Sequence, residues 1–140
     1  MTEPFRHTLR VRWGECDPQG VVFNANYLSY FDVAMTELWR ELGGYGAMVD
    51  AGVDMVVAEA NIRYLAGLRF DEEFEMRALI ARLGETSMST EIEVVRTSDD
   101  GPETVAQGSL RHVFVAPDGS GKRLIPDSIR EGLQRYALAS

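Results

Sequence analysis

The segment that most restricts the fold is residues 25–42, ANYLSYFDVAMTELWREL, which has helical periodicity. Its polar side chains recur at helical spacing along one narrow stripe, and apolar side chains fill the other sides. A helix that is so broadly apolar has to be covered by other elements on several sides. Gly43 and Gly44 come next in the chain and predict where the helix ends.

Five further stretches alternate apolar and polar residues, which is typical of antiparallel strands with one buried and one solvated face. They are Phe5 to Trp13, Val56 to Tyr64, Phe70 to Ile80, Met88 to Val94 and Ala106 to Phe114. The residues that this parity assigns to buried faces include Trp13, Val56, Ala58 and Phe70. The short links at residues 83–86 and 98–103 predict hairpins, and residues 126–138 predict a short closing helix.

The order of these segments is a strand, a long buried helix and then four antiparallel strands. This order predicts an α+β fold in which a curved antiparallel sheet wraps around one long central helix. A chain of 140 residues is long enough for one ordinary domain, so we expect a single domain over residues 1–140. Sheet edges that lack a partner strand favour self-association, so we expect a homo-oligomer.

Composition excludes several classes of protein. The formal net charge of −8 argues against a nucleic-acid binder, because neutralising phosphates needs a basic face. No apolar run approaches the roughly 20 residues of a membrane span, and the start, MTEPFRHTLR, has no stretch of the signal-peptide type. A single cysteine, Cys16, provides no internal disulfide and too few thiolates for a zinc site. We therefore expect a cytoplasmic protein that uses no membrane, metal or cofactor.

The loop before the helix, GECDPQGVVFNANYL at residues 14–28, contains the most informative carboxylate, Asp17. The sequence D-P-Q-G favours a type I turn, which by itself gives Asp17 a purely structural role. However, the loop leads into a helix N-terminus, whose unpaired N–H groups favour a developing oxyanion. A carboxylate beside such donors supplies two parts of an acyl-transfer site. Asn24 or Asn26 would then be the N-cap of the helix.

The stretch WGECDPQGVVFNANY at residues 13–27 resembles the signature loop of the 4-hydroxybenzoyl-CoA thioesterase family, which includes the YbgC-like acyl-CoA thioesterases of the hotdog fold. The similarity continues through YFDVAMTELWR (30–40), NIRYL (61–65) and RFDEEFE (69–75). It therefore covers most of the chain in order, and its most specific part is D-P-x-G-V-V-F-x-x-N-Y.

The resemblance implies hydrolysis of an acyl-CoA thioester to a free acid and CoA. It assigns the catalytic carboxylate to Asp17 and the carbonyl-polarising backbone N–H to the neighbourhood of Asn24. It also places Phe23 and Tyr27 near the acyl group. Because active sites in this family lie between subunits, the resemblance implies a dimer or a tetramer built as a dimer of dimers. The carboxylate would act as a nucleophile or as a general base, and the sequence leaves both routes open.

Two positions depart from the family pattern. Position 24 is Asn, whereas relatives often have Tyr or His there, so the resemblance implies a backbone role at this position and no side-chain role. The turn at residues 84–86 is Gly-Glu-Thr, whereas an aromatic-acyl relative has a basic run that holds the CoA phosphates. Either another arginine holds the phosphates, with Arg63, Arg69, Arg82 and Arg123 as the candidates, or the thioester carrier differs from CoA.

Other chemically active side chains have structural explanations. Cys16 beside Asp17 is expected to be a packed side chain rather than a nucleophile. His7 and His112 fall on apolar strand faces and are expected to be buried, hydrogen-bonded core residues. The acidic stretch 71–75 is expected to be a solvated strand face rather than a metal site.

Two further functions are weighed against the thioesterase. A hotdog dehydratase would need a histidine in residues 14–24, and there is none. The rival from another class is a non-catalytic hotdog module that binds acyl-CoA or serves in assembly, with Asp17 only shaping the turn.

Overall fold

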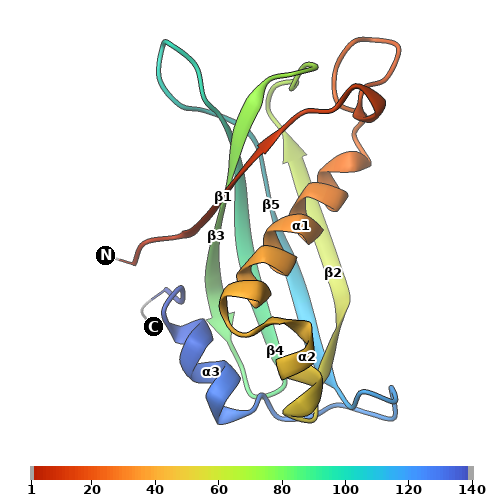
Figure 1. Cartoon of the computed structure of the whole chain (residues 1–140), viewed down its shortest axis with the longest axis vertical. Helices are drawn as coiled ribbons and strands as arrows, with labels where there is room; N and C mark the ends of the chain where they lie inside the picture. Colours follow the sequence, from red (N-terminus) through yellow and green to blue (C-terminus); the bar gives the residue numbers. More distant parts are fainter. Residues whose placement is uncertain (1, 139–140) are drawn as a thin grey trace.

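The computed structural model describes residues 2–138 (Figure 1). The strands are β1 (Phe5–Arg10), β2 (Asp54–Tyr64), β3 (Glu73–Leu83), β4 (Ser87–Arg96) and β5 (Glu103–Val115). The helices are α1 (Asn26–Glu41), α2 (Gly44–Asp50) and α3 (Asp127–Gln134), with a 3-10 turn at Trp13–Glu15.

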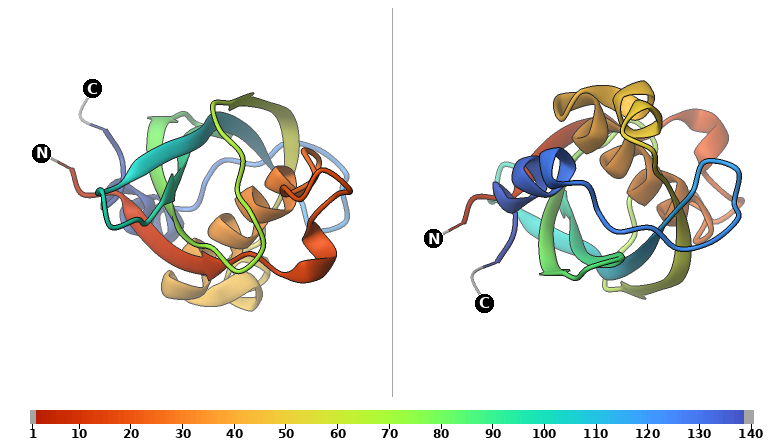
Figure 2. Two further views of the ribbon diagram at one scale, coloured as in Figure 1. Left: turned by 90° about the horizontal axis from the view of Figure 1, so that it is seen from above. Right: turned by 90° about the horizontal axis from the view of Figure 1, so that it is seen from below.

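The strands form one antiparallel sheet in the order β1-β3-β4-β5-β2. Seen from above, the sheet curls around the axis of α1 (Figure 2). The two shorter helices lie at the end of the sheet opposite the loop that precedes α1 (Figure 1). The predicted α+β fold, a curved antiparallel sheet around one long helix, is confirmed.

Helix α1 supplies much of the core, because one broad face of it packs against the sheet. Its buried residues are Tyr27, Tyr30, Phe31, Ala34, Met35, Leu38 and Trp39. The helix ends at Glu41, and Gly43 and Gly44 follow it with positive φ angles of 115° and 88°, as the stop signal predicts. The predicted asparagine N-cap is wrong, since the N-cap is Ala25 and no side chain caps the helix. Helix α2 was not predicted from the sequence.

The predicted first strand is too long at its C-terminal end. In the structure β1 stops at Arg10. The 3-10 turn that follows carries Trp13 out of the sheet, and 75% of Trp13 is exposed. Phe70 is also outside its predicted strand, because β3 begins only at Glu73. The rings of Trp13 and Phe70 pack edge to face at 5.2 Å, so these two aromatics cover each other rather than joining the core.

Strand β2 differs from its predicted parity because it contains a bulge. Val57 lies opposite His112 and Glu59 lies opposite Arg111, so Ala58 is an extra residue. The strand therefore changes face at Ala58, and the assignment of Val56 and Ala58 to the buried face is wrong. β2 is an edge of the sheet, and most of its residues are exposed.

Gly108 of β5 permits an unusually close approach of β2. A Cβ atom at this position would lie 2.0 Å from the carbonyl oxygen of Asn61, which is backbone and cannot turn aside. We expect Gly108→Ala to lower the free energy of unfolding by about 3 kcal/mol in a urea titration.

The control for this prediction is Gly46→Ala in α2, where a Cβ meets nothing within 4 Å. Since alanine favours a helix over glycine by about 1 kcal/mol, this control should be neutral or stabilising. Equal stability of Gly108→Ala and wild type would show that β2 does not need this close approach.

Candidate active site

Asp17 lies in a tight turn that holds its backbone and one carboxylate oxygen. The Gly20 N–H donates to the Asp17 carbonyl oxygen at 2.9 Å, and the Gln19 N–H donates to Asp17 Oδ1 at 2.9 Å. The Asp17 N–H donates to the Val21 carbonyl oxygen at 2.9 Å, which closes the loop. The predicted turn is confirmed. The carboxylate is half-buried, and within residues 2–138 its Oδ2 accepts no hydrogen bond.

The start of α1 presents free backbone donors a few residues beyond Asp17. The Phe23 N–H donates to the Glu15 carbonyl oxygen at 2.9 Å, and the Asn26 N–H donates to the Phe23 carbonyl oxygen at 2.9 Å. In contrast, the N–H groups of Asn24 and Ala25 have no backbone acceptor in the described chain. Free N–H groups at a helix N-terminus favour negative charge on a nearby oxygen.

Glu15 joins this loop to α1 and is a positioning residue that the sequence did not single out. Its Oε1 accepts the hydroxyl proton of Tyr30 at 2.8 Å and the backbone N–H of Arg12 at 2.8 Å. Its carbonyl oxygen accepts the Asn26 side-chain amide at 2.9 Å. Burial of Tyr30, followed by its hydrogen bond to the Glu15 carboxylate, raises the pKa of Tyr30 above its ordinary value. Tyr30 therefore stays a hydroxyl donor, and the loop has a fixed anchor on the helix.

The two residues expected near the acyl group occupy different environments. Phe23 is 48% exposed beside the loop. Tyr27 is only 2% exposed, and its ring packs edge to face on those of Tyr30 and Tyr64. The Tyr64 hydroxyl donates to the carbonyl oxygen of Asn24 at 2.9 Å, which ties the end of β2 to the start of α1. Contact of Phe23 and Tyr27 with an acyl group stays a prediction.

The other candidate side chains are Cys16, the two histidines and the acidic stretch 71–75, and their surroundings fit packing or ion pairing. Cys16 and His7 are half-buried, and His112 is buried. Among residues 2–138, no group of three or more His, Cys, Asp or Glu is arranged to hold a metal ion. The acidic stretch forms ion pairs: Glu73 with Arg10, Glu75 with Arg6 and Arg77, and Glu72 with Arg96.

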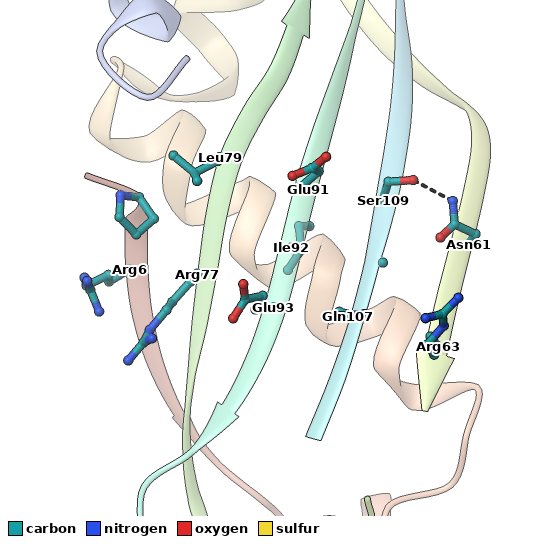
Figure 3. A pocket seen from close by; sticks show the side chains of 12 residues that line it. Arg6, Asn61, Arg63, Arg77, Leu79, Glu91, Ile92, Glu93, Gln107 and Ser109 are labelled. Atoms are coloured by element: carbon teal, nitrogen blue, oxygen red, sulfur yellow. Dashed lines mark hydrogen bonds between the residues drawn. The ribbon is translucent and has the colours of Figure 1, made fainter. Parts of the chain in front are cut away.

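A hollow of about 580 Å³ lies on the face of the sheet that points away from α1 (Figure 3). Arg77, Glu93, Gln107 and Arg63 face one another in register across four strands there. Charges of both signs and the neutral Gln107 share this row, as on a solvated sheet face. Because α1 and its N-terminal loop lie on the other side of the sheet, this hollow is separate from Asp17. Arg63, a candidate for the CoA phosphates, lies on this outer face.

A second cavity, of about 340 Å³, lies at the opposite end of α1 from Asp17, between α1, α2 and the first residues of β2. Its lining residues include Asp32, Met35, Trp39, Met48, Asp54, Met55 and His112. His112 is 4% exposed, as expected for a core histidine, but the prediction that it is hydrogen-bonded is wrong for Nδ1, which has no partner in the described chain. Burial lowers the pKa of His112, and the carboxylate of Asp32 opposes this shift only in part.

This pKa shift predicts a pH dependence of stability. The imidazole of His112 binds a proton less readily in the folded chain than in the unfolded chain. Lowering the pH therefore stabilises the unfolded state relative to the folded state. We expect the free energy of unfolding to decrease as the pH drops below the ordinary His pKa of 6.5, until the lower folded pKa is reached. His112→Gln should flatten this slope in urea titrations between about pH 7.5 and about pH 5. Identical slopes for the variant and wild type would contradict the assignment.

Comparisons with known proteins point to one family. The sequence profile described as Thioesterase superfamily matches residues 19–103, a range that begins just after Asp17. A solved structure of a hypothetical protein from Aquifex aeolicus is 30% identical, with a TM-score of 0.84, over 93% of this chain and 99% of that one. The acyl-CoA thioester hydrolase YbgC of Escherichia coli is 27% identical over 129 residues, which are 91% of this chain and 94% of the relative.

A third similarity concerns the fold. A 4-hydroxybenzoyl-CoA thioesterase mutant, solved with 4-hydroxybenzoyl-CoA, superimposes with a TM-score of 0.82 at 22% identity, over 94% of this chain and 99% of that one. Over residues 2–138 of the present structure, no helix is both long enough and apolar enough to span a membrane.

Proposed function

This chain belongs to the thioesterase superfamily, with the hotdog fold, and we propose that it hydrolyses acyl-CoA thioesters to a free acid and CoA through Asp17. The chain is a thioester hydrolase, like the relatives it matches. In this proposal residues 1–140 form a single hotdog domain.

The observation that carries this proposal is a half-buried carboxylate in the loop that leads into free backbone donors at the start of α1. Asp17 Oδ1 is held by the turn, while Oδ2 is available for chemistry. Oδ2 can attack the thioester carbonyl to form a mixed anhydride and release the CoA thiolate, after which water opens the anhydride. Alternatively, it can take a proton from a water molecule that attacks the carbonyl directly. Both routes put negative charge on the carbonyl oxygen, which in this proposal the free N–H groups of Asn24 and Ala25 stabilise.

The exposed edge of β2 supports a site shared between two copies. In an isologous antiparallel pairing of two β2 strands, only the central residue lies opposite its own symmetry mate, and residues equally spaced on either side of it lie opposite each other. If that pairing is centred on Glu59, Tyr64 of one copy lies opposite Asp54 of the other. Tyr64 contacts Asn24 in the loop of Asp17, and Asp54 lines the smaller cavity. We therefore expect a homodimer, or a dimer of dimers, in which the loop of one copy meets the cavity of its partner.

The test is the release of thiol from a diverse panel of aromatic, short-chain and medium-chain acyl-CoAs. We expect at least one thioester to be cleaved with kcat in the usual enzyme range of about 1 s⁻¹ or more. If none is cleaved although acyl-CoA binds, the alternative holds and the chain is a non-catalytic hotdog module that binds acyl-CoA.

A further inference from the structure

The smaller cavity contains two nitrogen atoms whose hydrogen-bonding capacity is unused. Trp39 and His112 both line it, at 6% and 4% exposed. Trp39 Nε1 and His112 Nδ1 are buried, and neither has a partner in residues 2–138. A buried polar group without a partner costs about 1–3 kcal/mol, so two of them in the lining of one cavity need an explanation.

The chemistry of these two groups indicates what would satisfy them. An indole N–H can only donate, so Trp39 needs an acceptor such as an oxygen atom. Burial keeps His112 neutral, and a neutral imidazole offers one donor and one acceptor. An oxygen-bearing group in the inner part of the cavity could therefore pair with both residues.

The surrounding charges argue that this group is neutral. The carboxylates of Asp32 and Asp54 line the same cavity, and the chain carries a net charge of −8. A carboxylate on the bound acyl group would therefore be repelled. Arg40 also lies there, but it is bound to Glu37 at 3.2 Å and 70% of its side chain is exposed. The rest of the lining is largely apolar, with Met35, Met48 and Met55 suited to hold a carbon chain or ring. A volume of about 340 Å³ is within the range of small-molecule sites.

The length of α1 separates this cavity from the Asp17 loop of the same chain. Asn26 begins the helix and Trp39 lies thirteen residues later, which is about 20 Å at 1.5 Å per residue. A short acyl group bound to one loop does not reach Trp39 of the same chain. A β2 pairing centred on Glu59, as proposed above, would instead bring the loop of a partner copy to this cavity.

Resting on the proposed function, we propose that Trp39 and His112 are specificity-determining residues of the acyl pocket. They select acyl groups that carry an uncharged oxygen, a hydroxyl or keto group, at the end remote from the thioester. A plain hydrocarbon of the same length leaves both nitrogen atoms unpaired and is a poorer substrate.

The test compares two acyl-CoAs of equal carbon skeleton, one with a distal hydroxyl or keto oxygen and one without it. We expect wild type to favour the oxygenated member about tenfold in kcat/KM. Trp39→Phe keeps an aromatic ring but removes the N–H, and His112→Leu removes both ring nitrogens. Each should reduce the preference severalfold by lowering kcat/KM for the oxygenated member only. Trp13→Phe, the same substitution at a residue 75% exposed and outside the cavity, should keep the wild-type preference.

The outcomes separate this inference from the function on which it rests. Hydrolysis of both members with equal kcat/KM by wild type, or an unchanged preference in both cavity variants, overturns the inference and leaves the thioesterase standing. Hydrolysis of neither member, and of no other acyl-CoA in the panel, overturns the proposed function. Calorimetric titration of wild type with the same pair then decides the inference: tighter binding of the oxygenated member, lost in Trp39→Phe, supports it, and equal binding overturns it.

Discussion

Asp17→Asn is expected to lower kcat for acyl-CoA hydrolysis by about a thousandfold while changing KM by only a few fold. Asn keeps a side-chain oxygen for the Gln19 N–H, which Asp17 Oδ1 accepts at 2.9 Å, so the turn should persist. The amide is neither a nucleophile nor a base, so the loss should be confined to the chemical step. The measurement is steady-state thiol release on the best acyl-CoA of the panel.

The chain offers a matched control at a second turn of the same kind. Asp118 Oδ1 accepts the Ser120 N–H at 2.8 Å, as Asp17 Oδ1 accepts the Gln19 N–H. Asp118→Asn should retain wild-type kcat, which separates the effect of an Asp-to-Asn change in a turn from the effect on chemistry. If Asp17→Asn also turns over at the wild-type rate, Asp17 has only the structural role.

Asn24→Pro is expected to lower kcat by about a hundredfold or more, because it deletes one of the free N–H groups before α1. Proline is tolerated near the start of a helix, and the Asn24 N–H has no backbone acceptor in the described chain to lose. The substitution therefore removes a stabilising donor from the transition state with little effect on the fold. Thermal unfolding should verify that the variant is folded before kcat is compared.

Asn24→Ala tests the same position with the backbone N–H retained. The Asn24 side chain is exposed and makes no cap bond to α1, so this variant should keep kcat within a few fold of wild type. An equally large loss in both variants would assign the effect to the side chain, contrary to our expectation of a backbone role.

The sequence predicted those parts of the fold that periodic burial controls. The broad apolar surface of residues 25–42 became α1, and the alternating stretches became the five strands. Irregular backbone was less predictable. The bulge at Ala58 and the 3-10 turn at Trp13–Glu15 each change the direction of side chains. Neither could be predicted from the residue types at these positions.

The candidate site was predictable only where one loop contains it. Asp17 and the donors near Asn24 lie within a few residues of each other, so turn chemistry and the helix start indicated both. The cavity with Trp39 and His112 combines the far end of α1 with α2 and with strands β2 and β5, and no local spacing links those residues. Glu15 was missed for a different reason, since its role depends on a contact with Tyr30 one helical turn into α1.

The most direct measurement of the role of Asp17 is a single-turnover experiment with enzyme in excess over one acyl-CoA. Acid quenching at increasing times gives the fraction of intact thioester, and this decay reports chemistry without product release. We expect the thioester to persist about a thousand times longer with Asp17→Asn than with wild type or Asp118→Asn. Decay at the wild-type rate in Asp17→Asn would contradict the central claim that this carboxylate performs the reaction.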